Sequence, residues 1–161
     1  MSRRFIVEAD GGSRGNPGTA AGGAVLLDAD TGGLLAEVAV YVGVATNNVA
    51  EYQGMIAGLR AAFARDAAAA VRVRMDSKLV VEQMSGNWKI KHPDMRELAR
   101  IAQELIAGRE VRFEWIPRHE NARADAIANE SMDQRASFTR DHDSFAGGGV
   151  VVPDDDGLLF R

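Results

Sequence analysis

The sequence predicts one α/β domain with a mixed β-sheet, followed by a short tail. Three stretches near the N-terminus are rich in β-compatible residues and are separated by turn-like segments, which predicts three antiparallel strands. From residue 46 onward, apolar side chains recur every three or four positions, which predicts helices, and two further strand-like stretches lie among them. With 161 residues, the chain is long enough for one well-packed domain and short for two.

The first predicted strand, Arg3–Asp10, ends in a carboxylate and runs into a glycine-rich segment over residues 11–18. Glycines at this point allow backbone or a substrate to approach Asp10 closely. They lack the G-x-G-x-x-G spacing of a dinucleotide loop, and no Gly-Lys-Ser/Thr of a phosphate loop follows. Asp10 is therefore a candidate site residue, although a tight hairpin capped by this aspartate would produce the same local pattern.

The second and third strands are predicted over Ala20–Leu27 and Leu34–Val44, with a turn between them. A helix should follow and run to about Arg65, because Tyr52, Ile56, Leu59 and Phe63 form an apolar stripe with helical spacing.

Three polar residues, Thr46, Asn47 and Asn48, precede this helix, and each can serve as its N-cap. Asn48 has the spacing of a loose capping box with Glu51, which lies in the first turn. Glycines at positions 54 and 58 cost helix stability, so they indicate close packing against the sheet. Such packing would bring Glu51 toward Asp10, whereas the alternative is an acid that simply favours a helix N-terminus.

A fourth strand, Val71–Asp76, alternates apolar and charged residues and also ends in an acid. Ser77 is predicted to cap the short helix that follows. Asp76 therefore lies where open α/β sheets bind ligands, at the carboxyl end of a strand and just before a helix. If a helix crosses over between the first and fourth strands, the two strands are parallel and place Asp10 and Asp76 on one rim of the sheet.

The last predicted elements are a helix that begins at Pro93, a fifth strand over Glu110–Pro117 and a helix that ends near Met132. Asn121 is the predicted N-cap of the last helix. Asp125 then falls in its first or second turn and is the fourth acid in such a position.

Composition narrows the function classes. The chain has no cysteine, which excludes disulfides and thiolate chemistry, and it has no apolar run near the roughly 20 residues of a membrane span. We therefore expect a cytoplasmic protein.

The net charge of −4 is unusual for a nucleic-acid-binding protein, but −3 of it comes from the segment Asp133–Arg161. Residues 1–132 carry −1, which becomes +3 if cations neutralise the four acids.

The last part of the chain loses helical periodicity at about residue 137 and contains glycines and an acidic run. We expect a domain over residues 1–136 and a tail or linker over residues 137–161.

Four blocks of the sequence resemble the signature blocks of the ribonuclease HI family. The blocks are Asp10-Gly-Gly-Ser13 with Gly15-Asn-Pro-Gly18, Thr46-Asn-Asn-Val-Ala-Glu51-Tyr52, Met75-Asp76-Ser77 and Asn121-Ala-Arg-Ala-Asp125. The resemblance implies a ribonuclease H-like fold, in which a five-stranded mixed sheet of order 3-2-1-4-5 is flanked by α-helices. It also implies a hydrolase, an endonuclease that cuts the RNA strand of RNA/DNA hybrids and leaves 5′-phosphate and 3′-hydroxyl ends.

Carried over block by block, Asp10, Glu51, Asp76 and Asp125 match the catalytic metal ligands of this family. The resemblance implies two Mg²⁺ ions, for which Mn²⁺ substitutes. Four hard oxygen ligands suit such ions, which can activate a water and stabilise the departing 3′ oxygen.

The resemblance also implies a set of positions that bind the substrate and read its 2′-hydroxyl groups. Within this set, Thr46 is expected to contact a DNA phosphate and Trp88 to lie along the DNA strand. The matching positions are Gly11, Gly12, Asn16, Thr46, Asn47, Asn48, Ser77, Lys78, Trp88 and Arg118.

Two departures from the best-known bacterial pattern affect these expectations. Only residues 85–93 join the two middle helices, so the basic protrusion of some members is missing and the chain resembles the compact type found in archaea and some bacteria.

The second departure is the loop before the last acid, which is shortened to Pro117-Arg118-His119-Glu120. His119 is the candidate for the family's mobile catalytic histidine, because imidazole exchanges protons near neutral pH. Compact members can have an arginine there, so Arg118 is the alternative, and an exposed loop histidine without a role is the third interpretation.

Two other functions are compatible with these residues. A nuclease of the same fold that acts on DNA, of the resolvase or transposase type, is the first, because fold does not determine substrate. The second is a module that binds hybrid without cutting it. We expect a monomer without membrane association, and relatives of this type are sometimes followed by a phosphatase-like domain.

Overall fold

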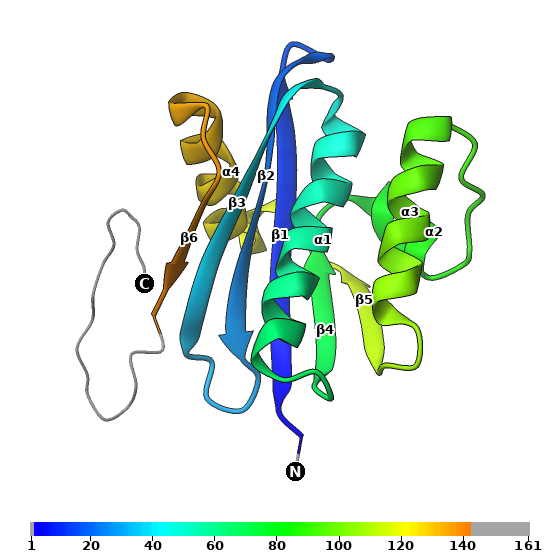
Figure 1. Ribbon diagram of the computed structural model, residues 1–161. Coiled ribbons are helices and arrows are strands. Elements are labelled where there is room, and N and C mark those ends of the chain that lie inside the picture. Colours follow the sequence, from blue (N-terminus) through cyan, green and yellow to red (C-terminus); the bar gives the residue numbers. More distant parts are fainter. Residues whose placement is uncertain (1, 143–161) are drawn as a thin grey trace.

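The computed structural model describes residues 2–142 (Figure 1). None of the helices in this part of the chain is long and apolar enough to cross a membrane. In chain order, the elements are β1 (Arg4–Arg14), β2 (Gly18–Asp28), β3 (Leu34–Ala45), α1 (Asn47–Arg65), β4 (Ala70–Met75), α2 (Lys78–Met84), α3 (Pro93–Ile106), β5 (Val111–Trp115), the 3-10 helix η1 (Arg118–Glu120), α4 (Ala122–Gln134) and β6 (Phe138–Asp141).

The sheet has the strand order β5-β4-β1-β2-β3-β6. Strands β1, β2, β3 and β6 are antiparallel, whereas β4 is parallel to both β1 and β5. The expected mixed sheet of order 3-2-1-4-5 is confirmed, and β6 adds a sixth strand beside β3.

Strand β6 lies in the segment that was expected to be a tail. Its Phe138 pairs with Ala39, and its Arg140 forms ion pairs with Glu37 and Glu130. These contacts join it to β3 and α4, so the sheet continues past the expected boundary at residue 136. Residues 143–161, the rest of the expected tail, lie outside the described residues.

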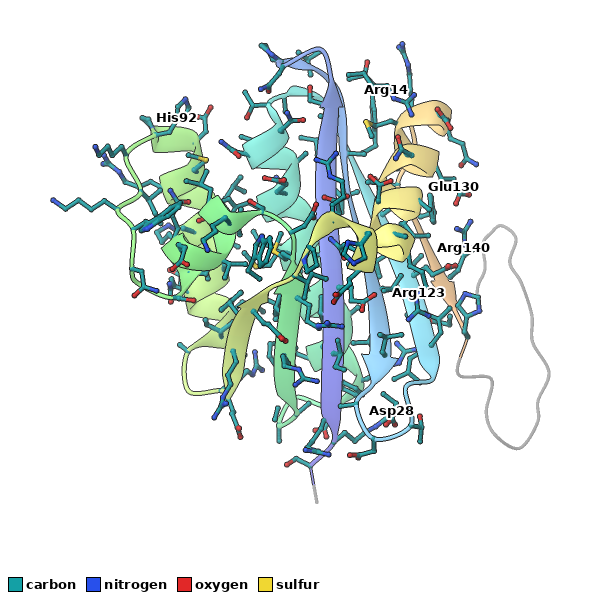
Figure 2. All side chains as sticks on the ribbon, turned by 180° about the vertical axis from the view of Figure 1, so that it is seen from behind. Arg14, Asp28, His92, Arg123, Glu130 and Arg140 are labelled. Carbon is teal, nitrogen blue, oxygen red and sulfur yellow. The ribbon has the colours of Figure 1, made fainter. Side chains whose placement is uncertain are left out.

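Helices cover both faces of the sheet: α1 and α3 lie on one face, and α4 lies on the other (Figures 1 and 2). Two adjacent glycines of β2 explain the close approach of α1 and α4. A Cβ atom at Gly22 would lie 2.4 Å from the backbone nitrogen of Gly54 in α1, and one at Gly23 would lie 2.6 Å from the backbone nitrogen of Ala128 in α4. Because successive strand residues face opposite sides, this glycine pair lets a helix backbone lie against each face.

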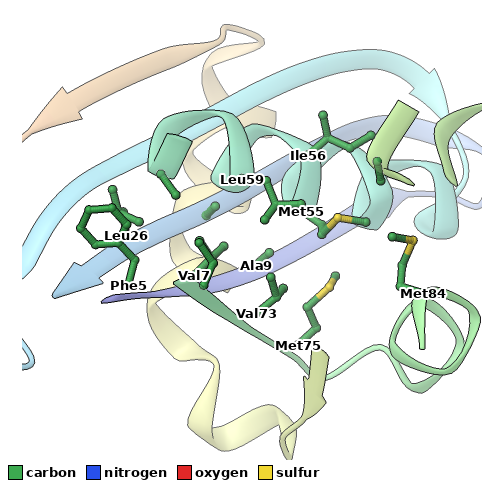
Figure 3. Close-up of a cluster of buried hydrophobic side chains, with 14 of the residues drawn as sticks. Phe5, Val7, Ala9, Leu26, Met55, Ile56, Leu59, Val73, Met75 and Met84 are labelled. Carbon is green, nitrogen blue, oxygen red and sulfur yellow. The ribbon is translucent and has the colours of Figure 1, made fainter. Parts of the chain in front are cut away.

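The main core lies between the sheet and α1 (Figure 3). Tyr52 extends this contact, since its buried hydroxyl donates a hydrogen bond of 2.8 Å to Gln83 of α2. Each fully buried large apolar side chain contributes about 1.5–3 kcal/mol, so this layer fixes how α1 is placed on the strands. The largest buried side chains of this core include Phe5, Val7, Leu26, Met55, Leu59, Val73 and Met75.

One local expectation was wrong. Strand β1 does not end at Asp10 but continues to Arg14, because Gly11 and the residues after it pair with β2. Its pairing with β4 does end there, at Ala9 opposite Met75, so the chain still leaves the parallel ladder at Asp10. Of the three candidate N-caps of α1, the structure has Thr46, whose hydroxyl accepts a hydrogen bond from the Val49 backbone, so Asn48 does not form the loose capping box.

Candidate active site

Four acids from four elements meet at one rim of the sheet. Asp10 and Asp76 follow the last paired residues of the adjacent parallel strands β1 and β4. Glu51 comes from the first turns of α1, where a Cβ atom at Gly11 would lie 2.3 Å from the Glu51 backbone nitrogen. Asp125 comes from the start of α4 on the opposite face, and it hydrogen-bonds the Asp10 side chain. The predicted convergence of these acids is therefore present in the fold.

The protonation of two of these acids is strongly affected by their surroundings. Burial and the charge of Asp76 raise the pKa of Asp10 to about 8, and a hydrogen bond that protonated Asp10 donates to Asp125 adds to the rise, although the Gly11 backbone N–H opposes it. Burial also raises the pKa of Glu51 to about 7, and the charge of Asp76 adds to it. A hydrogen bond from the Ser77 hydroxyl and the charge of Arg118 oppose the rise at Glu51. Desolvated carboxylates that repel one another are typical of functional sites and rare elsewhere.

The acids offer the donor chemistry that a hard divalent cation prefers, since all four provide carboxylate oxygens. In the described part of the chain, no three Asp, Glu or His side chains are arranged to hold an ion as they stand. Both carboxylate oxygens of Asp76 already have partners within the protein. Asp76 accepts a hydrogen bond of 2.9 Å from Asn121 at Oδ1, and its Oδ2 lies 3.5 Å from Nε of Arg118. The Arg118 side chain is 91% exposed and can move aside for a cation.

An open cleft of about 500 Å³ lies beside the acids. Seven of the ten predicted substrate positions line it, and they come from the glycine hairpin, the start of α1, the start of α2 and η1. They are Gly11, Gly12, Asn47, Asn48, Ser77, Lys78 and Arg118.

The other three predicted substrate positions lie outside this lining. Asn16 is near it, because its side-chain oxygen accepts a hydrogen bond of 3.0 Å from the Asn47 backbone. Thr46 caps α1, and Trp88 lies between α2 and α3 with 46% of its surface exposed.

The glycine hairpin is fixed to the start of α1. Ser13 donates from its backbone nitrogen to the Asn47 side chain at 2.7 Å and from its hydroxyl to the carbonyl of Ala45 at 2.7 Å. The hairpin therefore forms a stable wall of the cleft and holds its backbone groups in place.

Comparison with known proteins identifies the family. The sequence model of a family described as Reverse transcriptase-like matches residues 8–131. Bifunctional protein Rv2228c of Mycobacterium tuberculosis is 54% identical over 134 residues, which cover 83% of this chain and 36% of that protein, so the chain spans about a third of this relative. Ribonuclease HI of Halobacterium salinarum is 46% identical over 130 residues, which cover 77% of this chain and 62% of that protein. The solved structure of LC11-RNase H1 in complex with an RNA/DNA hybrid superposes with a TM-score of 0.77 at 40% identity and covers 81% of this chain and 98% of that one. The chain belongs to the ribonuclease H family.

In this ribonuclease H fold, the short loop before α4 holds the two candidates for the mobile catalytic residue, Arg118 and His119. Only one of them lies beside the acids. Arg118 lines the cleft beside Asp76. The His119 side chain is 81% exposed, and its Nε2 lies 3.8 Å from Glu120. Arg118 is therefore the loop residue that is nearest to the acids by its described contacts.

Sequence reasoning missed several residues of the site. Arg14 joins the hairpin to α4 through an ion pair of 2.6 Å with Asp133 and a hydrogen bond of 3.2 Å to Asn129. Asn121 was expected only as a helix cap, yet its side chain contacts Asp76. These partners are far apart in sequence, so no local pattern could have identified them, although Asn121 lies in the same block as Asp125.

Proposed function

We propose that this chain is an endonuclease that hydrolyses the RNA strand of RNA/DNA hybrids, with divalent cations held by Asp10, Glu51, Asp76 and Asp125. The meeting of these four acids beside an open cleft is the observation that supports the proposal most. Burying like charges together costs stability, and the raised pKa values of Asp10 and Glu51 reflect that cost. Such an arrangement is useful where cations neutralise the acids during function.

The proposed cofactor is a pair of Mg²⁺ ions, for which Mn²⁺ substitutes. When bound, these ions would activate a water and stabilise the departing 3′ oxygen, which would leave 5′-phosphate and 3′-hydroxyl ends. The chain's own residues hold the ions and the substrate in place. Arg118, whose Nε lies 3.5 Å from Asp76, is the proposed group that binds the negative charge of the substrate phosphate. His119 is the proposed group for proton transfer or product release, and movement of its loop would bring it to the site.

Backbone and amide groups of the cleft are suited to reading RNA. A 2′-hydroxyl both donates and accepts hydrogen bonds, and the Asn47 and Asn48 amides and the backbone of Gly11 and Gly12 offer both kinds of partner. Lys78, at the start of α2, adds positive charge for a phosphate. We assign Thr46 and Trp88, which lie outside the cleft lining, to the DNA strand. The relative LC11-RNase H1, whose structure holds an RNA/DNA hybrid, supports this substrate class.

A comparison of matched duplexes tests the proposal. One sequence is prepared as RNA/DNA, RNA/RNA and DNA/DNA, and each duplex is incubated with Mg²⁺ and the protein. We expect cleavage of the hybrid only, and its loss in Asp10→Asn. Asp66→Asn, which changes an acid at the end of α1 that does not line the cleft, is the matched control and should cleave normally. Cleavage of the DNA duplex would favour the DNA nuclease, and hybrid binding without cleavage would favour the binding module.

The proposed working form is a cytoplasmic monomer whose nuclease domain comprises the sheet and its helices. In longer relatives, a phosphatase-like domain is proposed to follow this domain.

A further inference from the structure

Asn121 is a buried amide that contacts the ends of both parallel strands from which Asp10 and Asp76 emerge. Only 1% of its surface is exposed. Its Nδ2 donates hydrogen bonds of 2.9 Å to the Ala9 carbonyl and 2.9 Å to Oδ1 of Asp76. Ala9 immediately precedes Asp10, so one side chain ties β1 and β4 together where the two acids leave the ladder.

The orientation of this amide is determined by its partners. A carbonyl and an ionised carboxylate can only accept hydrogen bonds, and the Asn121 NH₂ group has two hydrogens to donate. The reversed amide would place Oδ1 against two acceptors. Both hydrogens of Asn121 are therefore used, one on each strand.

This orientation is unfavourable for α4 itself. An asparagine at an N-cap normally accepts a hydrogen bond from the backbone of the first turn, but within the described residues the Asn121 side chain makes no such bond. Its Oδ1 is buried and has no partner in this part of the chain. A buried acceptor without a donor is destabilising. The hydrogen bond to Asp76 offers a reason for the missing cap bond and the unpaired Oδ1, because proteins depart from such local preferences mainly at functional sites.

Three of the four acids have a hydrogen-bond donor that belongs to the fold. The Gly11 backbone serves Asp10, the Ser77 hydroxyl serves Glu51, and Asn121 serves Asp76. With Oδ1 of Asp76 held by Asn121, its Oδ2 lies on the side of the exposed Arg118. The amide thus holds one carboxylate oxygen of Asp76 and leaves the other toward Arg118, which lines the cleft.

We propose that Asn121 is a positioning residue for the reaction: it fixes the Asp76 carboxylate and its distance from Asp10, so that Oδ2 is presented to the cation. This inference rests on the proposed function. Asn121 acts through Asp76 and does not itself touch the substrate. Donors that orient metal ligands commonly change metal affinity or activity by about 10–100-fold when they are removed.

Two variants and one control test the proposal. Asn121→Ala removes both donors, and Asn121→Ser retains a hydroxyl that can donate only once. Ser131→Ala is the control, because Ser131 is also a buried polar residue of α4, and its hydroxyl donates to the carbonyl of Ala136 at 2.7 Å, away from the acids. Three quantities are measured at a temperature where each variant is folded: kcat and KM on the hybrid, and the Mg²⁺ concentration for half-maximal activity. The fourth is the Tm increase caused by Mg²⁺ without substrate.

We expect Asn121→Ala to lower kcat by about tenfold or more, to keep KM within about twofold, and to raise the Mg²⁺ midpoint several-fold. The Mg²⁺-induced increase in Tm should shrink, since weaker binding stabilises the folded state less. Asn121→Ser should give intermediate values. Ser131→Ala should lower Tm but keep the wild-type kcat and Mg²⁺ midpoint.

Wild-type kcat and Mg²⁺ response in folded Asn121→Ala would overturn the proposal and leave Asn121 a purely structural tie. If Asn121→Ala does not fold, wild-type values in Asn121→Ser would overturn it equally. The Tm measurement separates this inference from the proposed function. A wild-type protein that binds Mg²⁺ but does not cut hybrid would refute the function, whereas the Asn121 variants would still report on the positioning of Asp76.

Discussion

Replacement of Asp10 by asparagine should abolish cleavage and, in the metal-free protein, raise stability. The carboxylate is buried beside Asp76 and Asp125, so the neutral amide removes charge repulsion while it keeps the shape of the side chain. Hybrid binding should stay within a few-fold of wild type, because the other residues that line the cleft are unchanged.

The magnitude follows from the pKa of Asp10, which rises from 3.8 to about 8 in the folded protein. Between these values the folded state binds a proton that the unfolded chain has released, so the free energy of unfolding falls as the pH rises from about 4 to about 8. The full rise corresponds to an upper limit of about 6 kcal/mol. Because charges in proteins interact through a high effective dielectric, we expect about 2 kcal/mol at pH 8. For a domain of this size, that is a Tm increase of about 6 °C.

The assay is thermal unfolding followed by circular dichroism in EDTA, from pH 4 to pH 9, for wild type and Asp10→Asn. The difference in Tm should be largest near pH 8 and small near pH 4, where wild-type Asp10 is protonated. Asp66→Asn is the control of opposite sign, since backbone hydrogen bonds from Arg3 and Ala68 lower the pKa of Asp66 and the substitution should lower Tm. A Tm decrease in Asp10→Asn at pH 8, or a Tm difference between the two proteins that does not vary with pH, would refute the charge repulsion between Asp10 and its neighbouring acids. Near-normal turnover would refute the metal assignment.

Three further predictions concern the loop, the C-terminal strand and the packing of α4. His119→Ala should lower kcat by about tenfold or more with little change in KM, and Arg118→Ala should mainly raise KM; steady-state kinetics that show the reverse would assign the loop's role to Arg118. Removal of residues 143–161 should leave Tm and activity unchanged. Removal of residues 138–161 should lower the free energy of unfolding, measured with denaturant, by about 2 kcal/mol, because the pairing of β6 and the Arg140 ion pairs are lost. An equal Tm for both truncations would show that β6 contributes no stability. Gly23→Ala should lower stability by about 3 kcal/mol or more, since its Cβ would lie 2.6 Å from the Ala128 backbone; a near-normal Tm would show that α4 can shift away.

Much of the fold and the candidate site could be predicted from local sequence. The period of the apolar residues indicated the order of strands and helices. The positions of Asp10 and Asp76 at the exit of neighbouring parallel strands then predicted that they share a rim. The glycines of α1 predicted close packing, and a Cβ atom at Gly54 would indeed lie 2.4 Å from the Asp10 carbonyl. Each of these inferences depends on short-range pattern and one connection rule.

The rest depends on partners that are distant in the chain. Gly11 extends β1 because it lies opposite Gly22, and glycines carry no strand-forming pattern of their own. Strand β6 has only four residues, and its position depends on ion pairs of Arg140 with Glu130 and Glu37. Asn121 has the local signature of an N-cap, but its hydrogen bonds go to residues on two other elements, 112 and 45 positions away.

Strand-specific cleavage of a labelled hybrid tests the central claim most directly. The RNA and the DNA strand of one RNA/DNA duplex are labelled in separate reactions, and each is incubated with the protein in Mg²⁺ and in EDTA. The acids around the cleft predict that only the RNA strand is cut, that its fragments carry 5′-phosphate and 3′-hydroxyl ends, and that EDTA stops the reaction. Cleavage of the DNA strand, or RNA cleavage that continues in EDTA, would contradict the account.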